Sequence, residues 1–91
     1  MPVRYCRANR TVWRLAHDTA LVRAVASNEV LVLAGAGSVL WQLLAEPLTL
    51  DQAARRIADA YDVPPEQIEQ DIALLINDLT GRNVLDRLDS T

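Results

Sequence analysis

The 91-residue sequence lacks lysine entirely and contains only one cysteine and one histidine. The single cysteine, Cys6, excludes an internal disulfide, and we assign it no role. Two such residues cannot supply the roughly four nitrogen or sulfur ligands of a zinc site. His17 precedes Asp18, but adjacent residues in a turn usually point apart, so we expect a solvated histidine rather than a catalytic pair. These absences exclude the commonest metal and nucleophile chemistries.

Two further motifs of enzymes and ion-binding proteins are missing. The acidic residues of a predicted helix, Glu66, Glu69, Asp71 and Asp78, do not follow the D-x-D-x-D-G pattern of a calcium loop. The segment Gly35-Ala36-Gly37 contains no lysine and no GxGxxG spacing, so it does not cradle phosphate. We therefore predict a protein without catalytic activity, metal or cofactor.

No apolar run approaches the roughly 20 residues that span a bilayer. The arginine-bearing start, MPVRYCRANR, is not followed by the apolar segment of a secretory signal. We therefore expect a cytoplasmic protein with no membrane partner.

The composition, 51% hydrophobic and 23% charged, is typical of a globular chain, and the length suits one domain over residues 1–91. We expect residues 1–9 to be flexible. Residues 1–35 carry about +3 (five arginines, two acids), and residues 36–91 carry about −6 (four arginines, ten acids). The basic segment could contact phosphate or an acidic partner, but we favour a solubilising flank that pairs with the acidic helices.

Three short segments have the alternation or the β-branched content of strands, and turn residues separate them. In the first segment, Val12 and Arg14 share one face, and Trp13 and Leu15 share the other. The strands are predicted at 11–16, 20–26 and 30–33, with turns at 17–18 and 27–28 and a glycine-broken corner at 35–37. Such a meander needs a covering layer of helices to be stable.

The rest of the chain predicts three helices, at 37–45, 50–61 and 65–80. Thr49 and Gln52 have the T-x-x-Q spacing of a capping box at the start of the second helix. The third helix has one apolar stripe, and Leu74 lies off it, so this helix could offer apolar surface to another molecule. Gly81 ends that helix, and Val84-Leu85 predicts a short extended segment. The fold class is therefore α+β: a small winged-helix-like domain with a three-stranded antiparallel sheet followed by three helices.

Winged helices commonly bind DNA, and they place basic residues on the recognition helix. Here the third helix carries four acids and no basic residue before Arg82. We therefore expect no nucleic-acid partner through this helix. A DNA-binding regulator that uses Arg4, Arg7 and Arg10 instead remains an alternative.

From residue 30 onward the chain resembles the PqqD-like domains, also called RiPP recognition elements. These domains bind leader peptides of ribosomally made, post-translationally modified peptides. The resemblance depends on an ordered set of segments: the strand ending at Leu33, G-x-x-x-W from Gly37 to Trp41 with Leu43-Leu44, Pro47-Leu48-Thr49-Leu50, Tyr61-Asp62-Val63, Asp71-Ile72, Leu75-x-x-x-Leu79 and Gly81-x-x-Val84-Leu85.

The resemblance implies that a leader peptide adds an antiparallel strand to the third strand, in the groove beside the third helix. Carried over by position, the strand of the site comprises Glu29, Val30, Leu31, Val32 and Leu33. The helix side of the groove comprises Asp71, Leu74, Leu75 and Asp78. The two aspartates would favour a leader with a lysine or arginine facing them.

Within this family the chain is most similar to the stand-alone proteins of lasso-peptide clusters. The expected partners are then the precursor leader peptide, a leader peptidase and an ATP-dependent cyclase. The alternative is the pyrroloquinoline-quinone type, which presents its precursor to a radical SAM enzyme. We expect a monomer, with a homodimer paired through the edge strand as the alternative.

Overall fold

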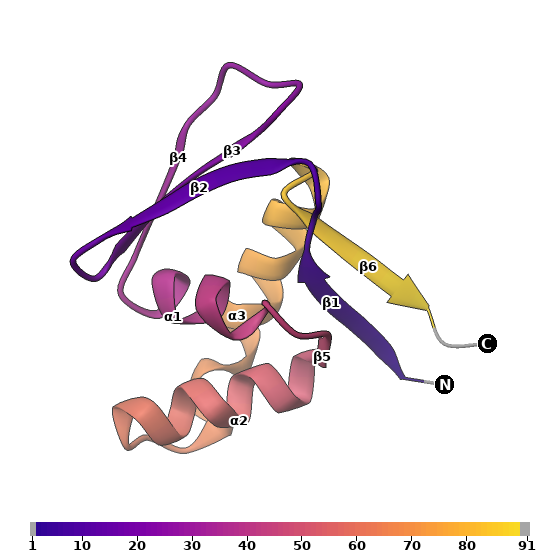
Figure 1. Ribbon diagram of the computed structural model, residues 1–91. Coiled ribbons are helices and arrows are strands. Elements are labelled where there is room, and N and C mark those ends of the chain that lie inside the picture. Colours follow the sequence, from indigo (N-terminus) through magenta and orange to yellow (C-terminus); the bar gives the residue numbers. More distant parts are fainter. Residues whose placement is uncertain (1, 90–91) are drawn as a thin grey trace.

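The computed structural model describes residues 2–89, which form two antiparallel sheets and three helices (Figure 1). Strand order is β2-β3-β4 in one sheet and β5-β1-β6 in the other. In chain order the elements are β1 (Val3–Arg7), β2 (Thr11–Ala16), β3 (Thr19–Ala24), β4 (Leu31–Ala34), α1 (Ala36–Leu43), β5 (Leu48–Thr49), α2 (Leu50–Tyr61), α3 (Pro65–Gly81) and β6 (Leu85–Asp89). The predicted α+β class, the meander and the three helices are confirmed.

Residues 1–9, which we expect to be flexible, contain the strand β1. Within this segment β1 pairs with β6 along its whole length, and Tyr5 lies opposite both Arg87 and Leu48. The N–H groups of Arg7 and Ala8 donate to backbone oxygens of Leu44 (2.9 Å) and Val84 (3.0 Å). The first residue lies outside the described part. Pairing at both edges gives the backbone hydrogen-bonding groups of β1 partners in distant parts of the chain.

The β2-β3-β4 meander has the predicted turn at His17-Asp18, where His17 adopts φ 59°. The second connection is longer than predicted, since β3 ends at Ala24 and residues 25–30 form a loop. The Arg23 side chain organises this loop by donating from Nη1 to the Ser27 carbonyl oxygen at 2.8 Å. A two-residue hairpin at Ser27-Asn28 is therefore a wrong expectation, because side-chain hydrogen bonds stabilise a wider loop.

The corner after β4 depends on one glycine rather than two. Gly35 has φ 57° and ψ −127°, a conformation that residues with a side chain rarely adopt. Gly37 instead lies within α1, where it is buried. The chain reverses at Gly35, and α1 begins at Ala36.

The capping box at the start of α2 is confirmed: Thr49 Oγ1 accepts from the Gln52 N–H at 3.1 Å, and Gln52 Oε1 accepts from the Thr49 N–H at 3.0 Å. Asp62 ends the helix in the left-handed conformation, with φ 56°. The next helix, α3, has Pro65 at its first position, as predicted. In residues 2–89, no helix combines the length and the apolar composition that crossing a bilayer requires.

One hydrophobic core joins the helices to both sheets. Leu40 and Trp41 of α1, and Leu44 directly after this helix, are completely buried at the centre of the core. One face of β2-β3-β4 covers α1 and α3, and β1 with β6 closes the opposite side, where the two ends of the chain lie together (Figure 1). Within residues 2–89, no helix or strand covers the other face of β2-β3-β4.

Candidate functional site

The β4 strand lies at an edge of its sheet. Within residues 2–89 it pairs with β3 alone, so its second edge has no strand beside it. Its side chains alternate, with Leu33 buried in the core and Val32 66% exposed on the outside. An unpaired edge presents a row of N–H and C=O groups to which another chain can bind.

Contacts link both ends of β4 to α3. At the C-terminal end, a Cβ added to Gly37 would lie 3.5 Å from Leu33 Cβ and 3.6 Å from Leu75 Cδ2. The start of α1, the end of β4 and the middle of α3 therefore meet at one point. In the loop before β4, the Glu29 carboxylate is bound by Nη1 of Arg82, the residue directly after α3. The helix consequently runs beside β4 in the opposite direction.

Arg82 contacts two of the predicted site residues, although the sequence did not single it out. Its Nε donates to both carboxylate oxygens of Asp78, at 3.1 and 3.2 Å, while Nη1 binds Glu29. The hydrogen bonds to Glu29 and then to Asp78 raise the pKa of Arg82 further above its already high usual value. The i,i+4 spacing of Asp78 and Arg82 was a usable signal. The pairing of Arg82 with Glu29, 53 residues away, has no corresponding signal in the sequence.

The four predicted site residues of α3 differ in their exposure and in their contacts. Leu74 is 61% exposed, and Asp71 is exposed and forms no ion pair within residues 2–89. Leu75 is half-buried and packs against the core. Asp78 is exposed but paired with Arg82. The structure therefore brings together Leu33 with Leu75 and Glu29 with Asp78.

The predicted strand residues point to two opposite faces of the sheet. Leu31 and Leu33 point inward, because they lie opposite Val22 and Ala20, which are both completely buried. Val32 points to the opposite face, and Val30 lines a hollow there. The side chains of Val30 and Val32 therefore lie outside the space between β4 and α3.

A cluster of aromatic and cationic side chains joins the two sheets. The rings of Trp13 and Trp41 meet edge to face, with centroids 6.1 Å apart. The Arg7 guanidinium lies 4.5 Å from the Trp13 centroid and 5.7 Å from that of Trp41. Cation–π contact of this kind stabilises the junction of β1, β2 and α1. Trp41 Nε1 is buried there without a hydrogen-bond partner.

The arrangement suits the binding of an extended peptide. In the described part of the chain, His, Cys, Asp and Glu side chains do not gather in groups of three or more that could hold a metal. Partial burial, and secondarily the negative charge of Asp86, raises the pKa of the Cys6 thiol and so disfavours the reactive thiolate. A free strand edge beside a partly apolar helix can accept an extended peptide.

The fold defines a class: a small α+β domain with an open sheet edge alongside its third helix. The sequence matches the family described as coenzyme PQQ synthesis protein D (PqqD) over residues 11–85, and the chain belongs to this family. The predicted family is thereby confirmed. The match begins at Thr11, so it also includes β2 and β3, which lie before the segment that carries the resemblance.

The fold is similar to that of a solved structure described as TbiB1 in complex with the TbiA(beta) leader peptide. The TM-score is 0.80 at 20% sequence identity, and the similarity covers 89% of this chain and 94% of that one. Comparison with curated proteins gave no match.

Proposed function

We propose that this protein is a non-catalytic recognition domain that binds the leader peptide of a ribosomally synthesised, post-translationally modified peptide. The observation that carries the proposal is the unpaired edge of β4 running beside α3. Membership of the PqqD family and similarity to a domain solved with a leader peptide support it. The peptide pairs antiparallel with residues 29–33, so that backbone hydrogen bonds supply much of the affinity.

Side chains of the added strand would supply the selectivity. Those that point inward meet the space where Leu33 and Leu75 contact the start of α1. Leu74, exposed on the same helix, extends this apolar surface toward solvent. A leader with one or two apolar or aromatic side chains at alternate positions fits this arrangement.

We expect fewer carboxylates to attract a positive charge of the leader than the sequence alone suggests. The Asp78 and Glu29 carboxylates share Arg82, which offsets part of their negative charge and weakens their attraction for a cation from the leader. Asp71 forms no ion pair within residues 2–89 and remains available. A lysine or arginine of the leader would therefore face Asp71.

The protein would act in the cytoplasm and present its bound leader to a leader peptidase and a cyclase of the lasso-peptide type. The alternative recipient is a radical SAM enzyme of the pyrroloquinoline-quinone type. Either recipient fits a binding domain that holds the peptide by one strand and leaves the rest of the precursor accessible.

A DNA-binding regulator that uses Arg4, Arg7 and Arg10 is the alternative from a different functional class. Arg4 and Arg7 belong to the paired strand β1, and Arg7 stacks over Trp13. The Arg7 side chain is thus engaged within the domain, whereas Arg4 and Arg10 are exposed, and a duplex titration tests this alternative.

A fluorescence-polarisation titration tests the proposal. The probe is the labelled leader of a precursor encoded beside the gene of this protein, with a scrambled leader and a DNA duplex as controls. We expect the leader, and neither control, to bind with a Kd in the nanomolar to micromolar range. Leu74→Arg should weaken binding at least tenfold without unfolding the protein, because Leu74 is exposed.

Asp71→Asn tests the charge preference separately, with Asp59→Asn on α2 as a matched control. Equal affinity for leader and scrambled peptide would refute the proposal, and so would salt-sensitive binding to duplex alone.

A further inference from the structure

The uncovered face of the β2-β3-β4 sheet is a second surface, distinct from the edge of β4. We call it the outer face and define it by the outward side chains of the three strands and the residue before β4: Val12, Arg14, Leu21, Arg23, Val30 and Val32. Strand register places these residues together, since Leu21 lies opposite both Arg14 and Val32. The buried side chains of the same strands point the other way, into the core.

The centre of the outer face is apolar and exposed. Val12 is 53% exposed, Val30 56% and Val32 66%. Together with Leu21 and part of Trp13, Val12 and Val30 line an open hollow of about 260 Å³. Neighbouring exposed valines on one sheet face are a costly arrangement for a surface that meets only water, and such patches mark interaction sites.

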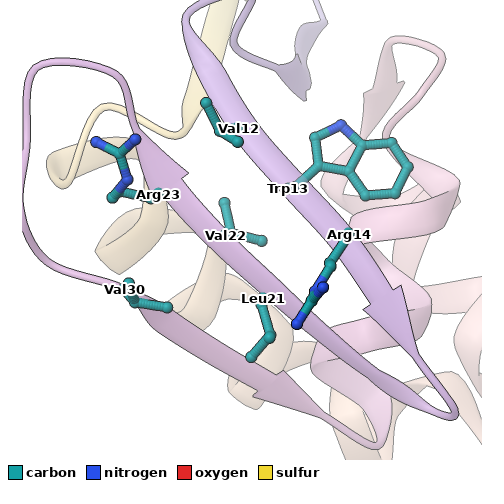
Figure 2. Close-up of a pocket in the computed structure, with 7 residues that line it drawn as sticks. All are labelled: Val12, Trp13, Arg14, Leu21, Val22, Arg23 and Val30. Carbon is teal, nitrogen blue, oxygen red and sulfur yellow. The ribbon is translucent and has the colours of Figure 1, made fainter.

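The rim of this hollow is cationic. Arg14 and Arg23 lie at opposite corners, with Leu21 and Val22 between them (Figure 2). In the described part of the chain, no acidic side chain lines the hollow, and Arg14 forms no ion pair. Arg23 is held in place by its hydrogen bond to Ser27, so its charge has a fixed position.

We propose that the outer face docks a segment of a partner protein that carries apolar side chains flanked by carboxylates. The apolar groups fill the hollow and the carboxylates pair with the two arginines, which gives charge complementarity. A second copy of this chain fits poorly, because two outer faces packed together would oppose four arginines with no carboxylate between them. A lipid surface fits less well than a protein segment, since the face is hollowed and carries only two cations.

The outer face and the proposed leader site can be occupied together. Val32 points to the outer face, whereas Leu33 points inward, and the leader would use the backbone edge of the same strand. A partner on the outer face would thus lie next to a bound leader without displacing it. The docking proposal stands on the outer face itself and does not depend on leader binding.

The probe for the test is a synthetic strand-forming peptide of alternating glutamate with leucine and valine, and its control has lysine in place of each glutamate. Each is titrated into the ¹⁵N-labelled protein by NMR. We expect the acidic peptide to shift amide resonances of outer-face residues on β2, β3 and β4, and the lysine peptide to leave them unchanged. Arg14→Glu and Val32→Glu should each weaken this binding at least tenfold, whereas Arg56→Glu, the same charge change on α2, should not.

Several results would overturn the docking proposal. These are equal binding of both peptides, shifts confined to α3 and the β4 edge, or dimerisation through the outer face in sedimentation. Binding to anionic vesicles with no binding to the acidic peptide would overturn it as well. A leader titration on the same sample reports the other site independently, so failure of one proposal is distinguishable from failure of the other.

Discussion

The two sheets of this domain have the same number of strands but different surroundings. The β5-β1-β6 sheet joins segments from the start, middle and end of the chain, and its strands carry charges of both signs. The β2-β3-β4 sheet forms from consecutive strands, and its only charged strand residues are arginines. One sheet completes the domain, while the other has, in the part of the chain that the structure describes, a free edge and an uncovered apolar face.

This difference separates the surface that closes the core from the two surfaces proposed to bind partners. Backbone pairing in β5-β1-β6 uses distant parts of the chain to close the core. In β2-β3-β4, a single strand, β4, contributes to three environments: the core through Leu33, the outer face through Val32, and the proposed leader site through its backbone. Substitutions that act on one sheet, or on one side of β4, should therefore have separable effects.

The largest effect is expected from deletion of residues 1–8. This removes β1, leaves β6 and β5 without their central partner, and takes away Arg7 from the two tryptophan rings. Since a small domain has only about 5–15 kcal/mol of total stability, we expect loss of cooperative thermal unfolding by circular dichroism. An unchanged melting temperature would show that the β5-β1-β6 sheet does not complete the domain.

Neighbouring substitutions on β4 should differ strongly. Leu33→Ala removes a buried side chain from the core and should lower the free energy of unfolding by about 2–4 kcal/mol. Val32→Ala changes an exposed residue and should alter it by less than about 0.5 kcal/mol. Urea denaturation measures both values. Similar losses would mean that the two sides of β4 are not as different as described.

A pair of glycine substitutions tests the corner between β4 and α1. Gly35→Ala forces a side chain into a backbone conformation that favours glycine and should cost about 1–3 kcal/mol. Gly37→Ala places a methyl group in ordinary contact with Leu33 and Leu75 within a helix, so we expect no loss or a gain of up to about 1 kcal/mol. Urea denaturation of both variants would contradict this account if Gly37→Ala were the more damaging change.

The smallest effect concerns Cys6, which lies opposite Asp86 in the β1–β6 pairing. Burial and then this carboxylate raise its pKa, so the folded state favours the neutral thiol. The resulting stability is present below the thiol pKa of the unfolded chain and is lost as pH rises through the folded value. Iodoacetamide should modify Cys6 more slowly than it modifies a short cysteine peptide, and Asp86→Asn should speed the reaction slightly. Equal modification rates for the peptide and the folded protein would contradict this prediction.

The sequence allowed prediction of features that depend on neighbouring residues. Alternation in residues 11–16 placed Val12 and Trp13 on opposite faces, and the Thr49–Gln52 capping box marked the start of α2; both are confirmed. The β1 strand was missed because its five residues pair only with segments more than 40 positions away. The contact of Arg82 with Glu29 was not predicted, because it also joins distant segments. The outer face was not predicted, because register across three strands decides which side chains meet.

Hydrogen–deuterium exchange of the β4 backbone, with and without the leader peptide, tests the central claim most directly. Amides of residues 29–34 that face the free edge should exchange quickly in the free protein and slow markedly when the leader pairs with them. Amides of β1 and β6, which are already paired, should change little. Protection confined to the helices, or no protection of β4 at saturating leader, would contradict binding by strand addition.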